Sequence, residues 1–313
     1  MVLFGAVVGA LACVLVALAY FARERIPMDD KARAKAPGQF ADLPAGKTHW
    51  LAEGPATGEV IILVPGATLP LWIWADLPGE LAKAGYRVIR YDLIGRGYSD
   101  RPNVRYDNDH FVQQLNELIA ALQIRTKVNL VGLAFGCLII SEFAIRHPSL
   151  VRSLCFIGPD GFGVSMARGS RLLTMPVIGS YITRVIGNRR LISRLNDYSS
   201  DRALIDWLRA RYVPELKFKG FKRALLSSVR HMPIHDARDA YQKVTARLPV
   251  TVIWGALDRV TPMPKEGDLR TVLARSNVHI LPEVGHLPHR ERSAETLKII
   301  SEHLDRVTAA VAS

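Results

Sequence analysis

The sequence predicts an α/β fold with a mostly parallel central sheet, helices on both faces of the sheet and a helical insertion. Three observations carry this prediction. Short apolar runs that end in glycine-containing turns recur along the chain, as in EVIILVPG and VNLVGLAFG, and are typical of buried parallel strands. Helical patterns alternate with these runs. Between the strand that ends at Pro159 and the strand that begins near Val250, the alternation stops and only helical patterns remain.

The N-terminal segment, Val2 to Ala22, contains no charged side chain. At ~1.5 Å per residue, a helix of this length matches the ~30 Å hydrocarbon core of a bilayer, so it predicts a membrane anchor. The alternative is a signal peptide, because Ala17-Leu18-Ala19 resembles a cleavage site, and the domain would then be secreted or periplasmic. The basic residues after this segment favour an anchor with the domain on the cytoplasmic side: Arg23, Arg25, Lys31, Arg33 and Lys35.

The rest of the chain divides into a linker, a core and an insertion. Residues 23–47 mix charges with proline and glycine and are expected to form a linker. The chain beyond the linker is long enough for one α/β core, expected over 48–162 and 236–313. Residues 163–235 are expected to form a helical cap inserted into this core.

A strand–turn–helix junction lies at residues 128–148. The strand-like VNLV runs directly into Gly132-Leu133-Ala134-Phe135-Gly136, and the helical run CLIISEFAIRHP comes next. This is the context of the G-x-S-x-G nucleophile elbow, a sharp turn that holds a serine hydroxyl above a helix N-terminus. Ala134 occupies the central position. Because a methyl group cannot attack a carbonyl, the chain as written is expected to lack serine-type covalent catalysis.

Other strand ends complete the pattern. EVIILVPGATLP at 59–70 ends in a glycine turn, and YRVIRYDLIGRGYSDRP at 86–102 continues into D-L-x-G-x-G-x-S. Downstream, the strand in VTVIWGALDRVTP delivers Asp258, and the strand in NVHILPEVGH delivers His286. The chain order is therefore nucleophile position, acid and histidine.

Together with the elbow, these four strand-end motifs resemble the α/β-hydrolase fold superfamily, over roughly residues 48 to 310, and the chain order is the one its enzymes use. Within the superfamily, the chain is most similar to the lipase and esterase branch that includes monoacylglycerol lipase-like enzymes and C–C bond hydrolases. The resemblance implies a helical cap that roofs the active site, supplies the acyl-side pocket and excludes water.

Two positions depart from the family pattern. Pro65-Gly66 replaces the usual His-Gly before the oxyanion residue, which keeps the backbone donor but loses a side chain that often braces the loop. Ala134 stands where esterases have serine, and where dehalogenases and epoxide hydrolases of this fold have aspartate. Either the serine was replaced to trap a complex, which the otherwise complete machinery favours, or the chain is a natural pseudoenzyme.

The resemblance also implies a role for each site residue. With serine at position 134, His286 would take the hydroxyl proton, and Asp258 would orient the imidazole and stabilise its protonated form. The backbone N–H groups of Phe135 and Ala67 would form the oxyanion hole.

Several residues are alternatives or neighbours to these. Asp160, at the end of another strand, is the alternative acid, and His289 is the alternative histidine, with packing or capping as its expected role. Asp92 and Ser99 are expected to brace their loop. The others are expected in structural or pocket-lining positions: His231, His235, Trp72, Trp74, Met175, Trp207 and Met232.

The three cysteines, Cys13, Cys137 and Cys155, are an odd number without paired spacing. They predict neither a disulfide framework nor a metal site, and we expect no cofactor. Cys137 lies three residues beyond position 134, on the predicted helix, so burial is its expected role rather than nucleophilic attack.

The predicted cap carries most of the net charge. Residues 165–230 contain 14 Lys or Arg and 4 Asp or Glu, in a chain whose formal net charge is +12. An anionic membrane surface is the expected partner, since each basic residue near such a surface contributes about 1 kcal/mol. The alternative is an anionic substrate, which the field of the cap would concentrate. No binding motif accompanies the charge, so we expect no nucleic-acid partner.

The sequence thus predicts a carboxylic ester hydrolase of the Ser-His-Asp type that acts on a lipophilic or anionic ester and lacks its nucleophile here. Two alternatives stay open. One is a non-catalytic pseudo-hydrolase that keeps the pocket for a ligand. The other is a C–C bond hydrolase, because the same triad serves that reaction.

Overall fold

The computed structural model describes residues 24–163 and 175–312, together with Val7, Gly9, Cys13, Val14, Val16 and Tyr20. Most of the predicted anchor at 2–22, and the first residues of the predicted cap, lie outside the described residues. None of the helices that the structure describes is both long enough and apolar enough to cross a bilayer.

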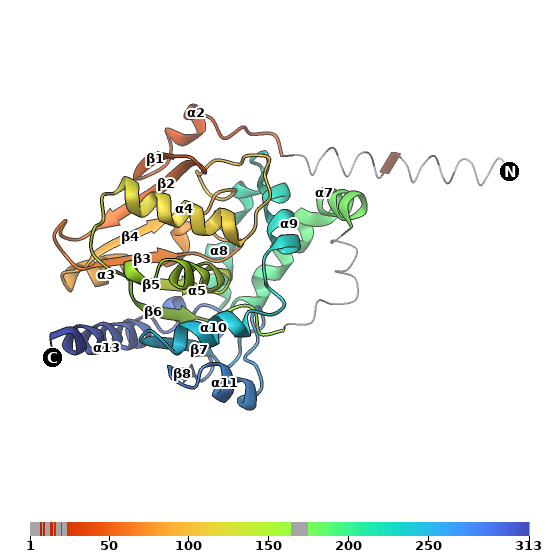
Figure 1. Ribbon diagram of the computed structural model, residues 1–313. Helices are drawn as coiled ribbons and strands as arrows, with labels where there is room; N and C mark the ends of the chain where they lie inside the picture. Colours follow the sequence, from red (N-terminus) through yellow and green to blue (C-terminus); the bar gives the residue numbers. More distant parts are fainter. Residues whose placement is uncertain are drawn as a thin grey trace.

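Eight strands form one sheet. In chain order they are β1 Gln39–Leu43, β2 Gly46–Glu53, β3 Val60–Val64, β4 Arg87–Tyr91, β5 Val128–Leu133, β6 Val151–Ile157, β7 Val250–Gly255 and β8 Asn277–Leu281. Their order across the sheet is β1-β2-β4-β3-β5-β6-β7-β8 (Figure 1). The pairs β1–β2 and β2–β4 are antiparallel, and all other neighbouring pairs are parallel. The predicted α/β-hydrolase sheet is therefore confirmed.

Strand β1 lies inside the predicted linker. Gln39 pairs with Trp50 and Leu43 pairs with Gly46, so the two strands form a hairpin around residues 44–45. The linker predicted over 23–47 is therefore too long, since it ends before Gln39. Pro44, one of the residues that suggested irregular chain, lies in the hairpin turn instead, which composition alone does not distinguish.

Both faces of the sheet are buried, which explains why β3 is apolar throughout. Successive strand residues point to opposite faces, so Ile62 faces one apolar core and Ile61 the other. The first core is covered by α4 Asn108–Ala121, α5 Phe135–Arg146 and α10 Arg238–Thr245. The second is covered by α3 Leu77–Lys83 and α13 Ser293–Ala312. Helices thus lie on both faces, as predicted (Figure 1).

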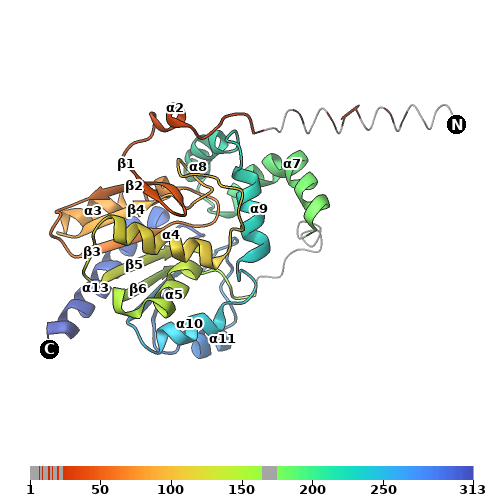
Figure 2. The same cartoon turned by 45° about the horizontal axis from the view of Figure 1, so that its top comes forward.

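The predicted insertion is helical in its described part. Its elements are α7 Pro176–Ser193, the 3-10 turn η4 Arg194–Asp197, α8 Arg202–Glu215 and α9 Phe221–His231. Figures 1 and 2 show these helices grouped at one end of the sheet. Apolar side chains from α8 and α9 join the second core, which fixes the cap on the sheet. The remaining short elements are α2 Asp30–Arg33, η1 Leu71–Trp74, η2 Pro148–Leu150, α11 Glu266–Val272 and α12 Pro288–Glu291.

The chain that leads out of the N-terminal segment is fastened to the cap. Ile26 forms a parallel bridge with Phe218, in the turn between α8 and α9. The carboxylate of Glu24 accepts the backbone N–H of Gly220 at 2.8 Å and that of Lys222 at 2.6 Å. Because these N–H groups begin α9 and have no acceptor within the helix, the Glu24 side chain caps the N-terminus of α9, whose N-cap position is Gly220, from a distant part of the chain.

Replacing Glu24 with alanine should therefore destabilise the protein. Losing an N-cap side chain costs about 1 kcal/mol of unfolding free energy. Urea unfolding followed by circular dichroism measures this loss as a lower midpoint. Glu24→Gln keeps one oxygen acceptor and should lose less. An unchanged midpoint for Glu24→Ala would show that this contact contributes nothing to stability.

Candidate active site

The predicted elbow is a sharp turn between β5 and α5, and Ala134 is its central residue. Helix α5 begins at Phe135, two residues earlier than the sequence pattern indicates. Ala134 has φ 50° and ψ −111°, a conformation that residues other than glycine rarely adopt and that costs on the order of 1–3 kcal/mol. The strained turn that presents a nucleophile is thus present in this chain, although the residue at its tip is alanine.

Gly136 allows the elbow to press against β3. A Cβ atom at this position would lie only 2.3 Å from the carbonyl oxygen of Val64. Phe135 is the first residue of α5, so its N–H has no acceptor inside the helix. In the described chain, the Ala67 N–H donates no backbone hydrogen bond either. Both donors that the sequence predicts for an oxyanion hole are therefore available, and both residues line the same cavity.

Asp258 and His286 form a buried pair beside this elbow. The carboxylate of Asp258 lies 2.8 Å from Nδ1 of His286, and the two residues are 6% and 2% exposed. Asp258 also accepts the backbone N–H groups of Val260 and Thr261 and the hydroxyl of Thr261. Since a carboxylate can only accept, the proton of the neutral imidazole lies on Nδ1, which leaves Nε2 as the basic nitrogen.

The alternative acid does not reach the histidine. Asp160 lines the cavity, but its side chain accepts the backbone N–H of Gly161 at 2.9 Å, and no hydrogen bond to His286 forms. Burial raises the pKa of the Asp160 carboxyl above its usual value. The structure therefore brings Asp258, and not Asp160, to His286.

His289 lies away from the cavity. Its Nε2 is 3.1 Å from the carbonyl oxygen of Ile73, and its ring packs 5.1 Å from that of Trp74. Burial lowers the pKa of His289 to about 3, so it is neutral at physiological pH. These contacts match the packing role expected for it.

The other candidates divide between packing and the cavity. His235 lines the cavity, whereas His231 lies at the exposed end of α9. The suggested pocket walls are not among the lining residues of the described chain. Trp74 and Met232 are buried in the core, Trp72 packs against Trp207, and Met175 is exposed. Cys137 is buried, and burial raises the pKa of its thiol, which opposes thiolate formation.

The D-L-x-G-x-G-x-S segment braces the loops around the site, as expected for Asp92 and Ser99. The carboxylate of Asp92 accepts the N–H groups of Leu71 and Tyr98 and pairs with His49 Nδ1 at 2.7 Å. The Ser99 hydroxyl donates to the Asp92 carbonyl. This buried network fixes the loop after β4.

Arg96, within the same segment, is a site residue that the sequence patterns did not reveal. Its Nε donates to the carbonyl of Ala67 at 2.8 Å. This bond braces the loop at 65–69, which carries the predicted oxyanion donor Ala67 and is called the oxyanion loop below. Arg96 thus supplies a brace for this loop in place of the histidine that Pro65-Gly66 lacks. A charged residue enclosed by two glycines in a buried loop was the available signal.

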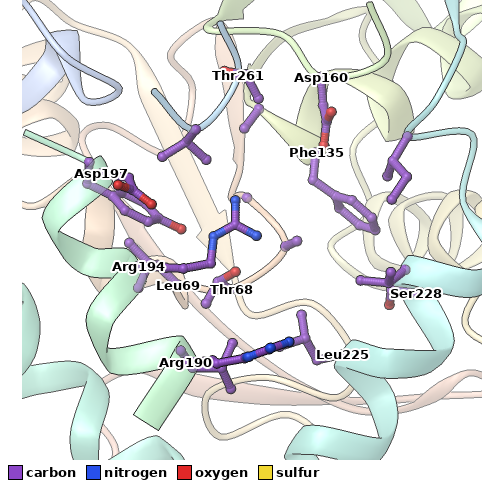
Figure 3. A pocket seen from close by; sticks show the side chains of 18 of the residues that line it. Thr68, Leu69, Phe135, Asp160, Arg190, Arg194, Asp197, Leu225, Ser228 and Thr261 are labelled. Atoms are coloured by element: carbon purple, nitrogen blue, oxygen red, sulfur yellow. The ribbon is translucent and has the colours of Figure 1, made fainter. Parts of the chain in front are cut away.

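The site opens into a cavity of about 740 Å³ between the sheet end and the cap. Position 134 and His286 lie on its sheet side, and residues of α7 and α9 line its cap side. Figure 3 shows the guanidinium of Arg194 near the centre of the pocket and Arg190 reaching toward Leu225. The pocket is therefore mainly apolar, with Arg190, Arg194 and Asp197 on the cap side and Asp160 on the sheet side. Among the described residues, no group of three His, Cys, Asp or Glu side chains could hold a metal ion.

Comparison with known proteins gives a consistent set of relatives. The family model described as "Alpha/beta hydrolase family" matches residues 61–299. The chain is 30% identical to a 2-hydroxymuconate semialdehyde hydrolase of Pseudomonas sp. (strain CF600), over 82% of this chain and 90% of that protein. It is 25% identical to a 2-hydroxy-6-oxo-2,4-heptadienoate hydrolase of Pseudomonas putida, over 79% and 89% of the two chains. Among solved structures, a membrane phospholipase A, a bacterial virulence factor, superposes with a TM-score of 0.69 at 22% identity, over 98% of this chain and 96% of that one.

Proposed function

The chain belongs to the alpha/beta hydrolase family, and from this premise we propose that its pocket binds a carboxylic ester that has an apolar part and an anionic group. The observation that carries the proposal is the shared cavity. It joins the elbow at Ala134, the Asp258–His286 pair and the cationic side chains of α7 and η4. With alanine at position 134, we expect binding without an acyl-enzyme, so the chain as written is expected to be inactive.

C–C bond hydrolysis is the second candidate. The two Pseudomonas relatives are hydrolases of a semialdehyde and of an oxo-heptadienoate, names that denote acids without an ester group. The same acid–base pair and oxyanion donors serve either bond, because both reactions pass negative charge to a carbonyl oxygen. Arg190 and Arg194 support the anionic part of the proposal in both cases, since a guanidinium binds a carboxylate in charge-assisted hydrogen bonds.

We expect the two arginines to set a preference for carboxylates. Decanoate should bind the chain more tightly than decanol, and Arg190→Gln with Arg194→Gln should remove this preference. Both side chains are solvent-exposed, so each contact is expected to contribute only about 5-fold in Kd. Isothermal titration calorimetry with the two ligands measures it. Arg184→Gln is the matched control, because Arg184 is an exposed arginine of α7 outside the lining residues. Equal affinity for decanoate and decanol in the unaltered chain would reject an anionic ligand.

We also propose that residues 2–22 anchor the chain in a membrane, with the domain on the cytoplasmic side and the cap against an anionic surface. Helix α7 supports this proposal, because it exposes apolar side chains beside its arginines: Val177 is 81% exposed, Tyr181 46% and Ile178 42%. Such a face can enter the boundary between headgroups and acyl chains while the basic residues meet anionic lipids. The resemblance to a protein named as a membrane phospholipase supports it too.

A chain without residues 1–23 should bind anionic vesicles and release them at high salt. Sedimentation with phosphatidylglycerol vesicles measures this, and phosphatidylcholine vesicles are the control. Salt weakens the attraction because it shortens the Debye length from about 10 Å at 0.1 M to about 3 Å at 1 M.

The full chain should stay membrane-bound under carbonate extraction. Recovery of a soluble form that begins near Tyr20 would indicate a cleaved signal peptide instead.

A further inference from the structure

Arg96 is a buried cation that contacts two separate parts of the site. The residue is 1% exposed. Its Nε donates to the Ala67 carbonyl on the oxyanion loop, and its Nη2 donates to the Ser228 hydroxyl on α9, both at 2.8 Å. In the described chain, its hydrogen-bond partners are the carbonyls of Ala67 and Ile94 and the Ser228 hydroxyl, and none of them is a carboxylate. Burying a guanidinium without an ion-pair partner costs free energy, so packing alone is a poor account of this residue.

The backbone around Arg96 directs its side chain inward. Gly97 has φ 52°, and a Cβ atom there would lie 2.0 Å from the Asp92 carboxylate, so the loop curls tightly around that group. The guanidinium then lies 5.3 Å from the ring of Phe111 and 5.9 Å from that of Phe135. These aromatic faces stabilise a cation. Burial lowers the pKa of Arg96 to about 10, which still leaves it charged at neutral pH.

Ser228 offers Arg96 a fixed acceptor from the cap. Its hydroxyl donates its own proton to the Ala224 carbonyl at 3.0 Å, which turns the oxygen lone pairs toward Nη2. Ser228 and Phe135 both line the cavity, and Figure 3 shows them on the same side of it. The guanidinium therefore connects the cap helix, the oxyanion loop and the residue directly after position 134.

We propose that Arg96 is a positioning residue that joins the oxyanion loop to α9, so that the Ala67 N–H points into the pocket while α9 is seated on the core. The hydrogen bond to the Ala67 carbonyl fixes the peptide plane next to that N–H, and the bond to Ser228 makes this orientation depend on the cap. The inference rests on the proposed hydrolase function, because it concerns the oxyanion hole of that reaction.

Two neighbouring serines separate this role from general packing. Ser228→Ala removes the hydroxyl that accepts from Arg96. Ser227→Ala removes the hydroxyl of the adjacent residue of α9, which accepts the Tyr106 N–H at 3.1 Å and has no bond to Arg96. In the Ala134→Ser background, Ser228→Ala should lower kcat by about 10- to 100-fold with KM nearly unchanged. The reason is that a displaced Ala67 N–H would lose a hydrogen bond that it makes mainly in the transition state. Ser227→Ala should leave kcat within about 2-fold. Ser228→Thr, which restores a hydroxyl, should recover most of the loss.

A second measurement uses the chain with Ala134. Hydrogen exchange followed by mass spectrometry should show faster exchange over residues 66–69 in Ser228→Ala and no change there in Ser227→Ala. Absence of any activity in Ala134→Ser would reject the proposed function, and the exchange data would still decide whether Arg96 links cap and loop. Equal effects of the two serine variants on kcat, or unchanged exchange over 66–69 in Ser228→Ala, would overturn the inference.

Discussion

Replacing Ala134 with serine should convert the chain into a serine hydrolase. The elbow already holds the strained backbone that presents a side chain to the cavity, and His286 Nε2 is the free base of a buried pair. Removing a serine nucleophile can cost on the order of 10⁶ in kcat, so the gain should be large. Hydrolysis of p-nitrophenyl butyrate and covalent labelling by a fluorophosphonate probe both measure it.

The controls for this variant separate the candidate functions. Ala134→Ser with His286→Ala keeps the hydroxyl but removes its base, and should lose both hydrolysis and labelling. A parallel assay with 2-hydroxy-6-oxo-2,4-heptadienoate distinguishes C–C bond cleavage from ester cleavage, since that acid contains no ester. Background rates on all substrates, together with no labelling, would reject the enzyme proposal and leave a pocket that only binds a ligand.

The parts of the site that the sequence predicts are those whose signals are local. The glycines of the elbow, the acid after β7 and the histidine after β8 each lie at the end of an apolar run, and the carboxyl ends of parallel strands meet at one edge of the sheet. For this reason the sequence alone predicts the pairing of Asp258 with His286.

The parts that the sequence did not predict depend on contacts between distant segments. Composition predicts a linker at β1, because pairing with β2, and not composition, makes this segment a strand. The sequence does not predict the role of Arg96, because its acceptors on Ala67 and Ser228 lie 29 and 132 residues away in the chain. The sequence left the aromatic and methionine candidates between pocket-lining and structural positions, because tertiary packing decides which side chains meet the cavity. In α7 the face that meets the cavity carries Ile182, Ile186 and Arg190.

In the Ala134→Ser background, His286→Ala should lower kcat by several powers of ten, and Asp258→Asn by on the order of 10⁴. The asparagine amide would keep the shape of the acid but present a donor to Nδ1, which favours the wrong tautomer of the imidazole. Activity against p-nitrophenyl butyrate measures both losses. Asp258 accepts two backbone N–H groups as well, so the thermal midpoint of each variant should be recorded beside its activity.

The rival residues are matched controls for this prediction. His289→Ala should retain most of the activity, because His289 contacts Ile73 and Trp74 and is held neutral by burial. Asp160→Asn should have a small effect, since the structure gives Asp160 no hydrogen bond to His286. If Asp258→Asn kept nearly full activity and Asp160→Asn were inactive, the catalytic acid would be Asp160, just after β6. The buried 2.8 Å contact between Asp258 and His286 argues against that outcome, because a buried carboxylate at this distance both fixes the ring and stabilises its charged form.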